Sequence, residues 1–213
     1  FPEEVPVLEK RAKQVLKKDI KPLDILTEEA FKNALKVDMA LGCSTNTALH
    51  LPAIAHEAGI DLNIELINQL REQVPHLCSL SPAGKYHIQD LNEAGGVPAV
   101  MKVLSDEGVL NEELLTVTTE NIEKNLEGVE VLDQNIIRDF ETADHKEGGL
   151  AVLTGNIAPD GSVVKQAAVA DEMLVHQGPA RVFNSEEEAV EAIHNGEIKA
   201  GDVVVILYEG PKG

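Results

Sequence analysis

The feature that most constrains the fold is a change of hydrophobic period about two thirds of the way along the chain. Before residue 136, apolar side chains recur every three or four residues, as on the buried face of a helix, with a few short apolar runs between them. After residue 150, short β-branched runs alternate with turn residues. We therefore predict an α/β chain, with a mostly helical α/β segment at residues 1–138, a polar linker at 139–149 and a small β-barrel-like module at 150–213.

The first segment contains the expected helices. Apolar stripes bounded by Pro, Gly or capping residues predict helices at 3–18, 27–35, 47–58, 62–74, 86–93, 97–104 and 119–126. Pro52 lies inside one of these ranges, so that helix either kinks at Pro52 or begins near residue 51, because Pro fits only a first turn. Short apolar runs predict strands at 76–80 and 117–118.

The last third of the chain contains the expected strands, at 150–157, 163–169, 180–183 and 202–208. The first two are joined by a Pro-Asp-Gly turn at 158–161. A capping box at 185–188 predicts a helix over 189–194. Five consecutive aliphatic residues at 203–207 predict a fully buried strand. A buried strand followed by one loop needs pairing partners, which indicates a piece of a longer protein.

Composition excludes several partners. The chain is 43% hydrophobic but only 3% aromatic, so its core must be aliphatic, and its formal net charge is −19. Nucleic acids and anionic membranes bind basic surfaces, so neither is expected as a partner. Two cysteines are too few for a disulfide framework, and no signal peptide or membrane-spanning apolar run is present. These observations predict a cytoplasmic location.

The most informative short stretch is Gly-Cys-Ser-Thr-Asn at 42–46, which leads into a helical pattern. Ser44, Thr45 or Asn46 could each cap that helix through a side-chain oxygen. The same helix start presents free backbone N–H groups, which suit a carboxylate or a phosphate. The five residues alone favour the cap, and the ligand site stays open as the alternative.

Other motifs add no chemistry. Cys43 and Cys78 are 35 residues apart, without the CxxC spacing of a metal site, so both are interpreted as buried structural cysteines. Because His76 lies two residues before Cys78, a metal site built from these residues stays open as the alternative. The seven histidines form no HExxH motif, and the paired glycines form no GxGxxG phosphate loop. Composition and spacing therefore define an acidic α/β protein without assigning a reaction.

Several blocks of the sequence, taken together, resemble the dihydroxy-acid/phosphogluconate dehydratase family. They run in family order at 40–47, 54–59, 84–86, 94–101, 148–161, 173–183 and 201–213. The resemblance implies a hydro-lyase that converts 2,3-dihydroxy acids to 2-keto acids in branched-chain amino-acid biosynthesis.

The resemblance also implies cofactors. In the family, an iron–sulfur cluster with an open iron position withdraws the departing hydroxyl, a Mg²⁺ site with a carbamylated lysine holds the carboxylate end, and a deprotonated serine is the candidate base. The family's three cluster cysteines and its metal Asp and Lys are expected before Phe1. A further metal Glu and the base Ser are expected after Gly213. The chain is thus expected to be an inactive internal fragment that binds no cofactor, with Cys43 and Cys78 outside the cluster.

The family's active site lies between an α/β domain and a β-barrel. By resemblance, the expected substrate-binding residues are Ser44, Thr45, Asn46, Glu209 and Lys212, the alternative being a helix cap and a strand-end turn. The parent enzyme is expected to be a homodimer acting on a small dihydroxy acid. Two other hypotheses stay open: a fragment of a sugar-acid, phosphogluconate-type dehydratase, and a non-catalytic folded or dimerising module. A phosphorylated substrate should need more basic residues than this chain offers.

Overall fold

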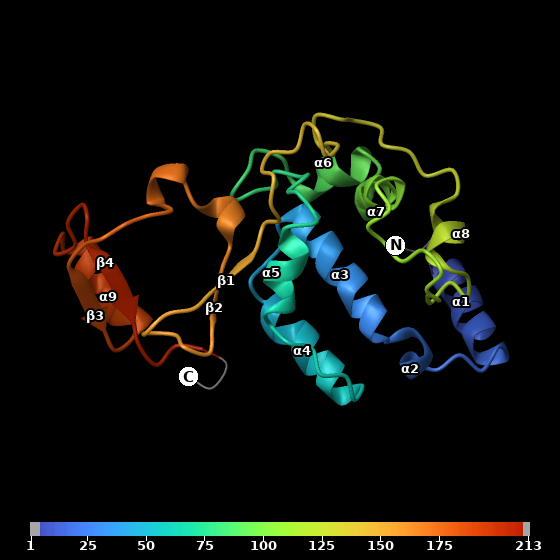
Figure 1. The fold of residues 1–213 in the computed structure, drawn as a ribbon, viewed down its shortest axis with the longest axis horizontal. Coiled ribbons are helices and arrows are strands. Elements are labelled where there is room, and N and C mark those ends of the chain that lie inside the picture. Colours follow the sequence, from blue (N-terminus) through green and yellow to red (C-terminus); the bar gives the residue numbers. More distant parts are fainter. Residues whose placement is uncertain (1–4, 211–213) are drawn as a thin grey trace. The chain divides into compact units, whose positions relative to one another are not determined.

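A computed structural model describes residues 5–210 of the chain, in two compact units that divide after Ala168. The first unit contains α1 (Val5–Lys17), α2 (Pro22–Ile25), α3 (Glu28–Leu41), α4 (Thr47–Glu57), α5 (Leu66–Arg71), α6 (Ile88–Glu93), α7 (Gly96–Asp106), α8 (Ile122–Leu126), β1 (Ala151–Leu153), β2 (Ser162–Val164) and a 3-10 turn, η1 (Gln166–Ala168) (Figure 1). The second contains η2 (Asp171–Met173), β3 (Ala180–Phe183), α9 (Glu186–His194) and β4 (Val203–Ile206).

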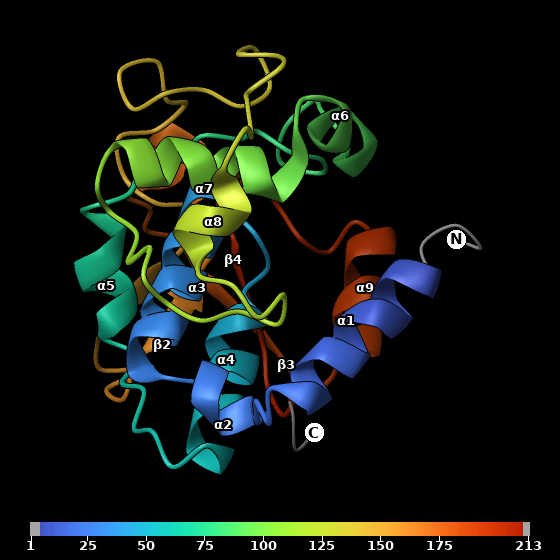
Figure 2. The ribbon, with the colours of Figure 1, turned by 90° about the vertical axis from the view of Figure 1, so that its right-hand side faces the viewer.

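Helix α3 is the centre of the first unit. Thr27 caps it by accepting a hydrogen bond from the Ala30 N–H at 3.2 Å, and Glu28 and Glu29 place negative charge at the positive end of its dipole. Helix α5 lies alongside α3, and α7 lies across it (Figures 1 and 2). Helices α5 and α7 thus cover the apolar face of α3.

The core of the first unit is aliphatic, as the composition predicts. Its largest fully buried side chains are Leu35, Met39, Leu77, Leu91, Leu104, Ile137, Leu150, Val74, Val100 and Cys78. None of the helices in the described part of the chain is long and apolar enough to cross a membrane.

The predicted helices are confirmed, but several begin or end at other residues than expected. Helix α3 continues to Leu41, six residues past the expected end, so residues 39–41 are helical. Helix α4 begins at Thr47 and includes Pro52, so the alternative start near residue 51 is wrong. The helix expected at 62–74 is shortened to α5.

The strand expected at 76–80 is wrong. This buried segment is extended, but it makes only isolated bridges, from His76 to His145 and from Leu80 to Tyr86. The backbone N–H groups of Leu77 and Cys78 both point to the carbonyl of Ala40, at 2.8 and 3.2 Å. The segment therefore satisfies a free carbonyl near the end of α3 instead of joining a sheet.

The strand expected at 117–118 is also wrong. Residues 116–120 form a turn in which the Thr116 N–H donates to the Glu120 carbonyl, and Thr119 has a φ of +70°. A left-handed residue reverses the chain direction and ends any extended run. Helix α8 begins only after this turn, where the side chain of Asn121 accepts from the Lys124 N–H.

The hairpin expected after residue 150 is confirmed but shorter. Strands β1 and β2 are antiparallel, with Val152 opposite Val163. Asn68 of α5 holds β1 by two hydrogen bonds of 2.9 Å, one to the N–H and one to the carbonyl of Val152. This attachment explains why the first compact unit extends to Ala168, beyond the linker expected at 139–149.

In the second unit, β3 and β4 are parallel, with Ala180 opposite Val203, and α9 connects them. Ser185 caps α9 by accepting from the Glu188 N–H, as predicted. In a capping box, the Glu188 carboxylate would also accept a hydrogen bond from the Ser185 N–H. Here it accepts instead from the N–H of the preceding residue, Asn184, at 3.0 Å.

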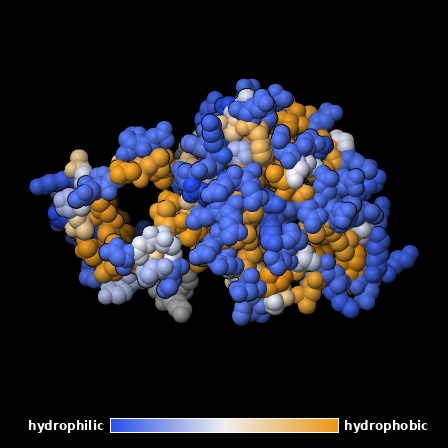
Figure 3. Space-filling view, viewed as in Figure 1, coloured by the Kyte–Doolittle hydropathy of each residue, from blue (hydrophilic) through white to orange (hydrophobic). Residues whose placement is uncertain are grey.

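The prediction that 203–207 is fully buried is wrong for this structure. Val203 and Ile206 are 37% and 40% exposed, and Figure 3 shows hydrophobic residues at the surface around α9, β3 and β4. Two strands and one helix are too few to cover both faces of a sheet. The described residues form two separate strand pairs and no closed barrel.

We expect Leu104→Ala to lower the free energy of unfolding by about 2–5 kcal/mol, because it leaves a cavity in the α7 contact with the core. Urea denaturation followed by circular dichroism measures the change. The matched control is Leu16→Ala, since Leu16 is also helical but 79% exposed. Equal losses for the two variants would contradict the assigned core.

Candidate functional site

The candidate site is the 42–47 loop, which joins the end of α3 to the start of α4. Gly42 ends α3 with a φ of +57°, and its N–H donates to the Asp38 carbonyl. The next turn leaves Ser44, Thr45 and Asn46 exposed. The structure therefore presents the three predicted residues together at one surface of the first unit.

The prediction that one of these side chains caps α4 in the usual way is wrong. Asn46 occupies the capping position, but it is already helical and makes no side-chain cap bond. The hydroxyl oxygen of Ser44 accepts from the Asn46 N–H at 3.2 Å, which stabilises the turn itself. The helix starts through backbone bonds from Thr47 and Ala48 to the carbonyls of Ser44 and Thr45. The loop's polar side chains thus face solvent without serving as the helix cap.

A buried carboxylate lies beneath the loop. Asp38 is only 6% exposed, and its Oδ1 accepts a hydrogen bond of 2.8 Å from the Thr47 hydroxyl. Its Oδ2 has no hydrogen-bond partner among the described residues. Burial raises the pKa of the Asp38 carboxyl above its ordinary value, and the Thr47 hydroxyl and the nearby Cys43 thiol oppose that rise.

A buried histidine contacts the start of the loop. His76 is 2% exposed, stacks on His145 with ring centroids 5.5 Å apart, and has no partner for either ring nitrogen within the described chain. Burial and the neighbouring His145 lower the pKa of His76, so the ring is neutral at pH 7. A Cβ on Gly42 would lie 2.5 Å from the His76 Nε2. Glycine is therefore required at position 42 both by φ and by space.

Asp38 and His76 together hold the buried side-chain polar atoms that lack a partner in the described part of the chain. Buried polar groups of this kind are uncommon and call for a reason. Neither residue was predicted. A signal existed for Asp38, which is a single acid in the apolar run Val-Asp-Met-Ala-Leu at 37–41. His76 had no comparable signal.

The two cysteines have the surroundings of structural thiols. Burial raises the pKa of Cys43 to about 12, with a further contribution from Asp38, and burial raises that of Cys78 to about 12 as well. Metals bind the thiolate, which these sites disfavour at neutral pH. No group of three potential metal ligands occurs among the described residues.

The two other predicted site residues belong to the second unit. The Glu209 carboxylate accepts a 3.0 Å hydrogen bond from the N–H of Glu186, the first residue of α9. This bond gives Glu209 a structural role at the positive end of a helix. Lys212 lies outside the described residues.

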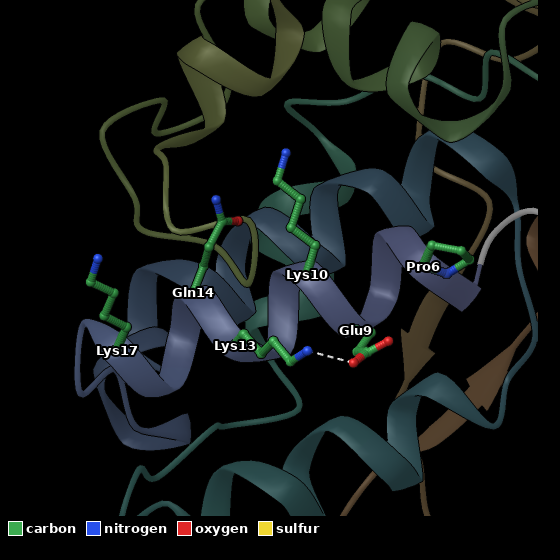
Figure 4. Close-up of a pocket in the computed structure, with 6 residues that line it drawn as sticks. All are labelled: Pro6, Glu9, Lys10, Lys13, Gln14 and Lys17. Carbon is green, nitrogen blue, oxygen red and sulfur yellow. Dashed lines mark hydrogen bonds and ion pairs between the residues drawn. The ribbon is translucent and has the colours of Figure 1, made fainter.

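Two surface depressions lie elsewhere among the described residues of the first unit. One runs along α1 and is lined by Pro6, Glu9, Lys10, Lys13, Gln14 and Lys17 (Figure 4). All six come from a single exposed helix, and the Lys13 ammonium pairs with the Glu9 carboxylate at 2.5 Å. Another depression, near α3 and α7, is apolar and includes Val37, Met101 and Leu115.

Comparison with known proteins places the chain in a family. The model for the N-terminal domain of the dihydroxy-acid/6-phosphogluconate dehydratases matches residues 5–125, and the model for their C-terminal domain matches 135–213. The chain belongs to the dihydroxy-acid/6-phosphogluconate dehydratase family, which confirms the resemblance found in the sequence.

Three similar proteins all carry the name dihydroxy-acid dehydratase. A protein of Halothermothrix orenii named dihydroxy-acid dehydratase is 60% identical over 216 residues, covering 100% of this chain and 39% of the relative. Proteins with the same name from Acetivibrio thermocellus and Caldanaerobacter subterraneus are each 58% identical over 200 residues, covering 94% of this chain and 36% of the relative. The chain spans about two fifths of the length of the curated relatives it matches.

We expect Gly42→Ala to destabilise the first unit more than Gly59→Ala. Both glycines are left-handed, with φ of +57° and +76°, so each alanine costs about 1–2 kcal/mol of backbone strain. A Cβ at position 59 meets nothing within 4 Å, whereas one at 42 must displace the His76 ring. Urea titration of both variants measures the difference. Equal destabilisation would contradict the close contact between Gly42 and His76.

The thiols are predicted to react slowly with iodoacetamide. A pKa of about 12 in place of 9.0 makes the thiolate fraction at pH 8 about a thousandfold smaller. Alkylation of Cys43 and Cys78, followed by mass spectrometry, should be slow in the folded protein, accelerate above pH 10, and become fast in urea. Rapid modification of folded protein at pH 8 would contradict the assigned burial.

Proposed function

We propose that this chain is part of a dihydroxy-acid dehydratase, a hydro-lyase that converts 2,3-dihydroxy acids to 2-keto acids in branched-chain amino-acid biosynthesis. The observation that carries the proposal is the identity of 60% across the whole chain to a relative with that name. The match includes both family domains. The chain alone is proposed to be inactive, since it spans only about two fifths of such relatives.

The proposed enzyme uses an iron–sulfur cluster and Mg²⁺. The described residues do not fit either group: both thiols are held protonated, and no three potential ligands lie together among them. We therefore propose that the ligands lie in other parts of the full-length protein and that Cys43 and Cys78 take no part in the reaction. Loss of water needs a Lewis acid at the hydroxyl and a base at C2, and those groups come from outside this segment.

Within this chain, the 44–46 residues are proposed to line the substrate site. Ser44, Thr45 and Asn46 are exposed side by side, and the hydroxyl and amide groups that they carry donate hydrogen bonds to a substrate carboxylate. The start of α4 adds the positive end of a helix dipole. Glu209 and Lys212 are proposed as further substrate-binding residues, with the Lys212 ammonium pairing with a substrate carboxylate.

A sugar-acid dehydratase of the phosphogluconate type is the second candidate, because the family model carries both names. The names of the relatives and the net charge of −19 favour the dihydroxy acid over a phosphorylated substrate. A non-catalytic folding or dimerising module is the remaining alternative, and it predicts no binding of either substrate.

The two strand pairs are proposed to belong to a β-barrel that further strands complete in the full-length protein. The exposed apolar residues of β4 support this, since a barrel would bury them. In that arrangement, residues 1–138 belong to the α/β domain, 139–149 form the linker and 150–213 begin the barrel domain. The whole enzyme is proposed to be a cytoplasmic homodimer.

The first test is turnover by the full-length protein. Purified without oxygen and supplied with iron, sulfide and Mg²⁺, it should convert 2,3-dihydroxyisovalerate to the 2-keto acid and act far more slowly on 6-phosphogluconate. The 213-residue chain under the same conditions should be inactive. Preference for the phosphorylated acid would favour the second candidate, and inactivity toward both would favour the non-catalytic module.

The loop is tested by Ser44→Ala and Asn46→Ala in the full-length enzyme. Each should raise the KM for the dihydroxy acid by about tenfold, the effect of losing one hydrogen bond to a charged group. Asn135→Ala is the control, because Asn135 is also exposed and in the first unit. Unchanged KM for both loop variants would contradict a substrate role for this loop.

A further inference from the structure

One residue holds both ends of the 42–47 loop. The backbone carbonyl of Asp38 accepts from the N–H of Gly42 and, at 3.4 Å, from that of Cys43. Its side chain accepts from the hydroxyl of Thr47, the first residue of α4, at 2.8 Å. The entrance and the exit of the loop are thus tied to the same residue of α3.

The hydrogen bond between Asp38 and Thr47 lies below the surface, while residues 44–46 of the loop are exposed. Asp38 is more than nine tenths buried, and Thr47 is half-buried. Between them, Ser44, Thr45 and Asn46 face solvent, and the hydroxyl of Ser44 is used only inside the turn. The hydrogen bond from Thr47 is therefore the side-chain link in the described structure that joins the start of α4 to the end of α3.

The hydrogen bonding of the Asp38 carboxyl is incomplete. Its Oδ2 is enclosed and has no partner among the described residues, a costly arrangement for a residue with a purely structural function. An amide or an apolar residue would fill the same space with less penalty. The observation points to a use for this residue at the loop that depends on Thr47.

We propose that Asp38 is a positioning residue, which through Thr47 holds residues 44–46 in the arrangement that binds the substrate carboxylate. The inference rests on the proposed function, since it gives the loop a substrate. Asp38 does not touch the substrate in this account. It fixes the direction of the first turn of α4 and hence the places of the Ser44, Thr45 and Asn46 donors.

The positioning follows from the geometry of the link. The hydrogen bond from the Thr47 hydroxyl to the buried Asp38 carboxyl is 2.8 Å long and directional, so it restricts the rotation of Thr47 and the turn that precedes it. Without the Thr47 hydroxyl, Gly42 still ends α3, but the start of α4 is no longer hydrogen-bonded to Asp38. Donors on a less restricted loop bind a carboxylate more weakly, because ordering the loop then costs entropy on binding.

The test uses Thr47→Val in the full-length enzyme, a change that keeps the side-chain shape and removes the hydroxyl. We expect the KM for the dihydroxy acid to rise by about tenfold, while kcat changes by less than about threefold. Thr47→Ser restores the hydroxyl and should return KM to within about threefold of the parent. If Thr47 contributed only to stability, Thr47→Val would lower the melting temperature but would not raise KM while leaving kcat nearly unchanged.

The matched control is Thr142→Val. Thr142 also donates its hydroxyl to an aspartate, Asp139, at 2.7 Å, but in a segment remote in sequence from the loop. This variant should leave both KM and kcat unchanged. An equal rise of KM in Thr142→Val would overturn the proposal, because the effect would then not be specific to the loop.

The experiment separates this inference from the proposed function. If Asn46→Ala and Ser44→Ala raise KM but Thr47→Val does not, the loop binds substrate and the positioning role of Asp38 is wrong. If none of the three variants changes KM in an active enzyme, the substrate role of the loop fails, and the inference fails with it. If Thr47→Ser does not restore KM, the hydroxyl link is not the cause.

Discussion

The structure of the first unit depends on a close backbone approach that only glycine permits. A Cβ on Gly149 would lie 2.4 Å from the Cα of Gly42, and one on Gly148 would lie 2.7 Å from the Cβ of Met39. The Gly149 N–H donates to the Met39 carbonyl at 3.0 Å, and its own carbonyl accepts from Ala167. Segments more than a hundred residues apart in sequence are thereby joined at the end of α3, where the candidate loop begins.

Polar groups are buried beside the aliphatic core at this junction. Asp38, four residues before Gly42, and His76, whose ring lies against Gly42, are only 6% and 2% exposed. One oxygen of Asp38 recovers a hydrogen bond from Thr47, and that bond also orders the start of α4. The packing of glycines and the presentation of the 44–46 side chains are thus parts of one arrangement.

Much of this could be predicted from local patterns, and the failures have physical causes. Apolar spacing predicts the helices, and the small polar residues at 44–46 predict that a helix starts after them, as α4 does at Thr47. The apolar run at 76–80 predicts a strand wrongly, because a buried extended segment and a strand share the same pattern. The exposure of Val203 and Ile206 depends on how many strands cover the sheet, which local sequence does not encode. The Asp38–Thr47 link joins two elements across a loop, so neither residue's neighbours reveal it.

The most direct test of this proposal is a crystal structure of the full-length protein with a 2-keto acid, the product of the proposed reaction, bound. We predict that the product carboxylate accepts at least one hydrogen bond, of about 2.7–3.2 Å, from Ser44, Thr45 or Asn46, while the Thr47 hydroxyl remains bonded to Asp38. A product bound in the active site with its carboxylate held by other residues, and no contact with this loop, would contradict it.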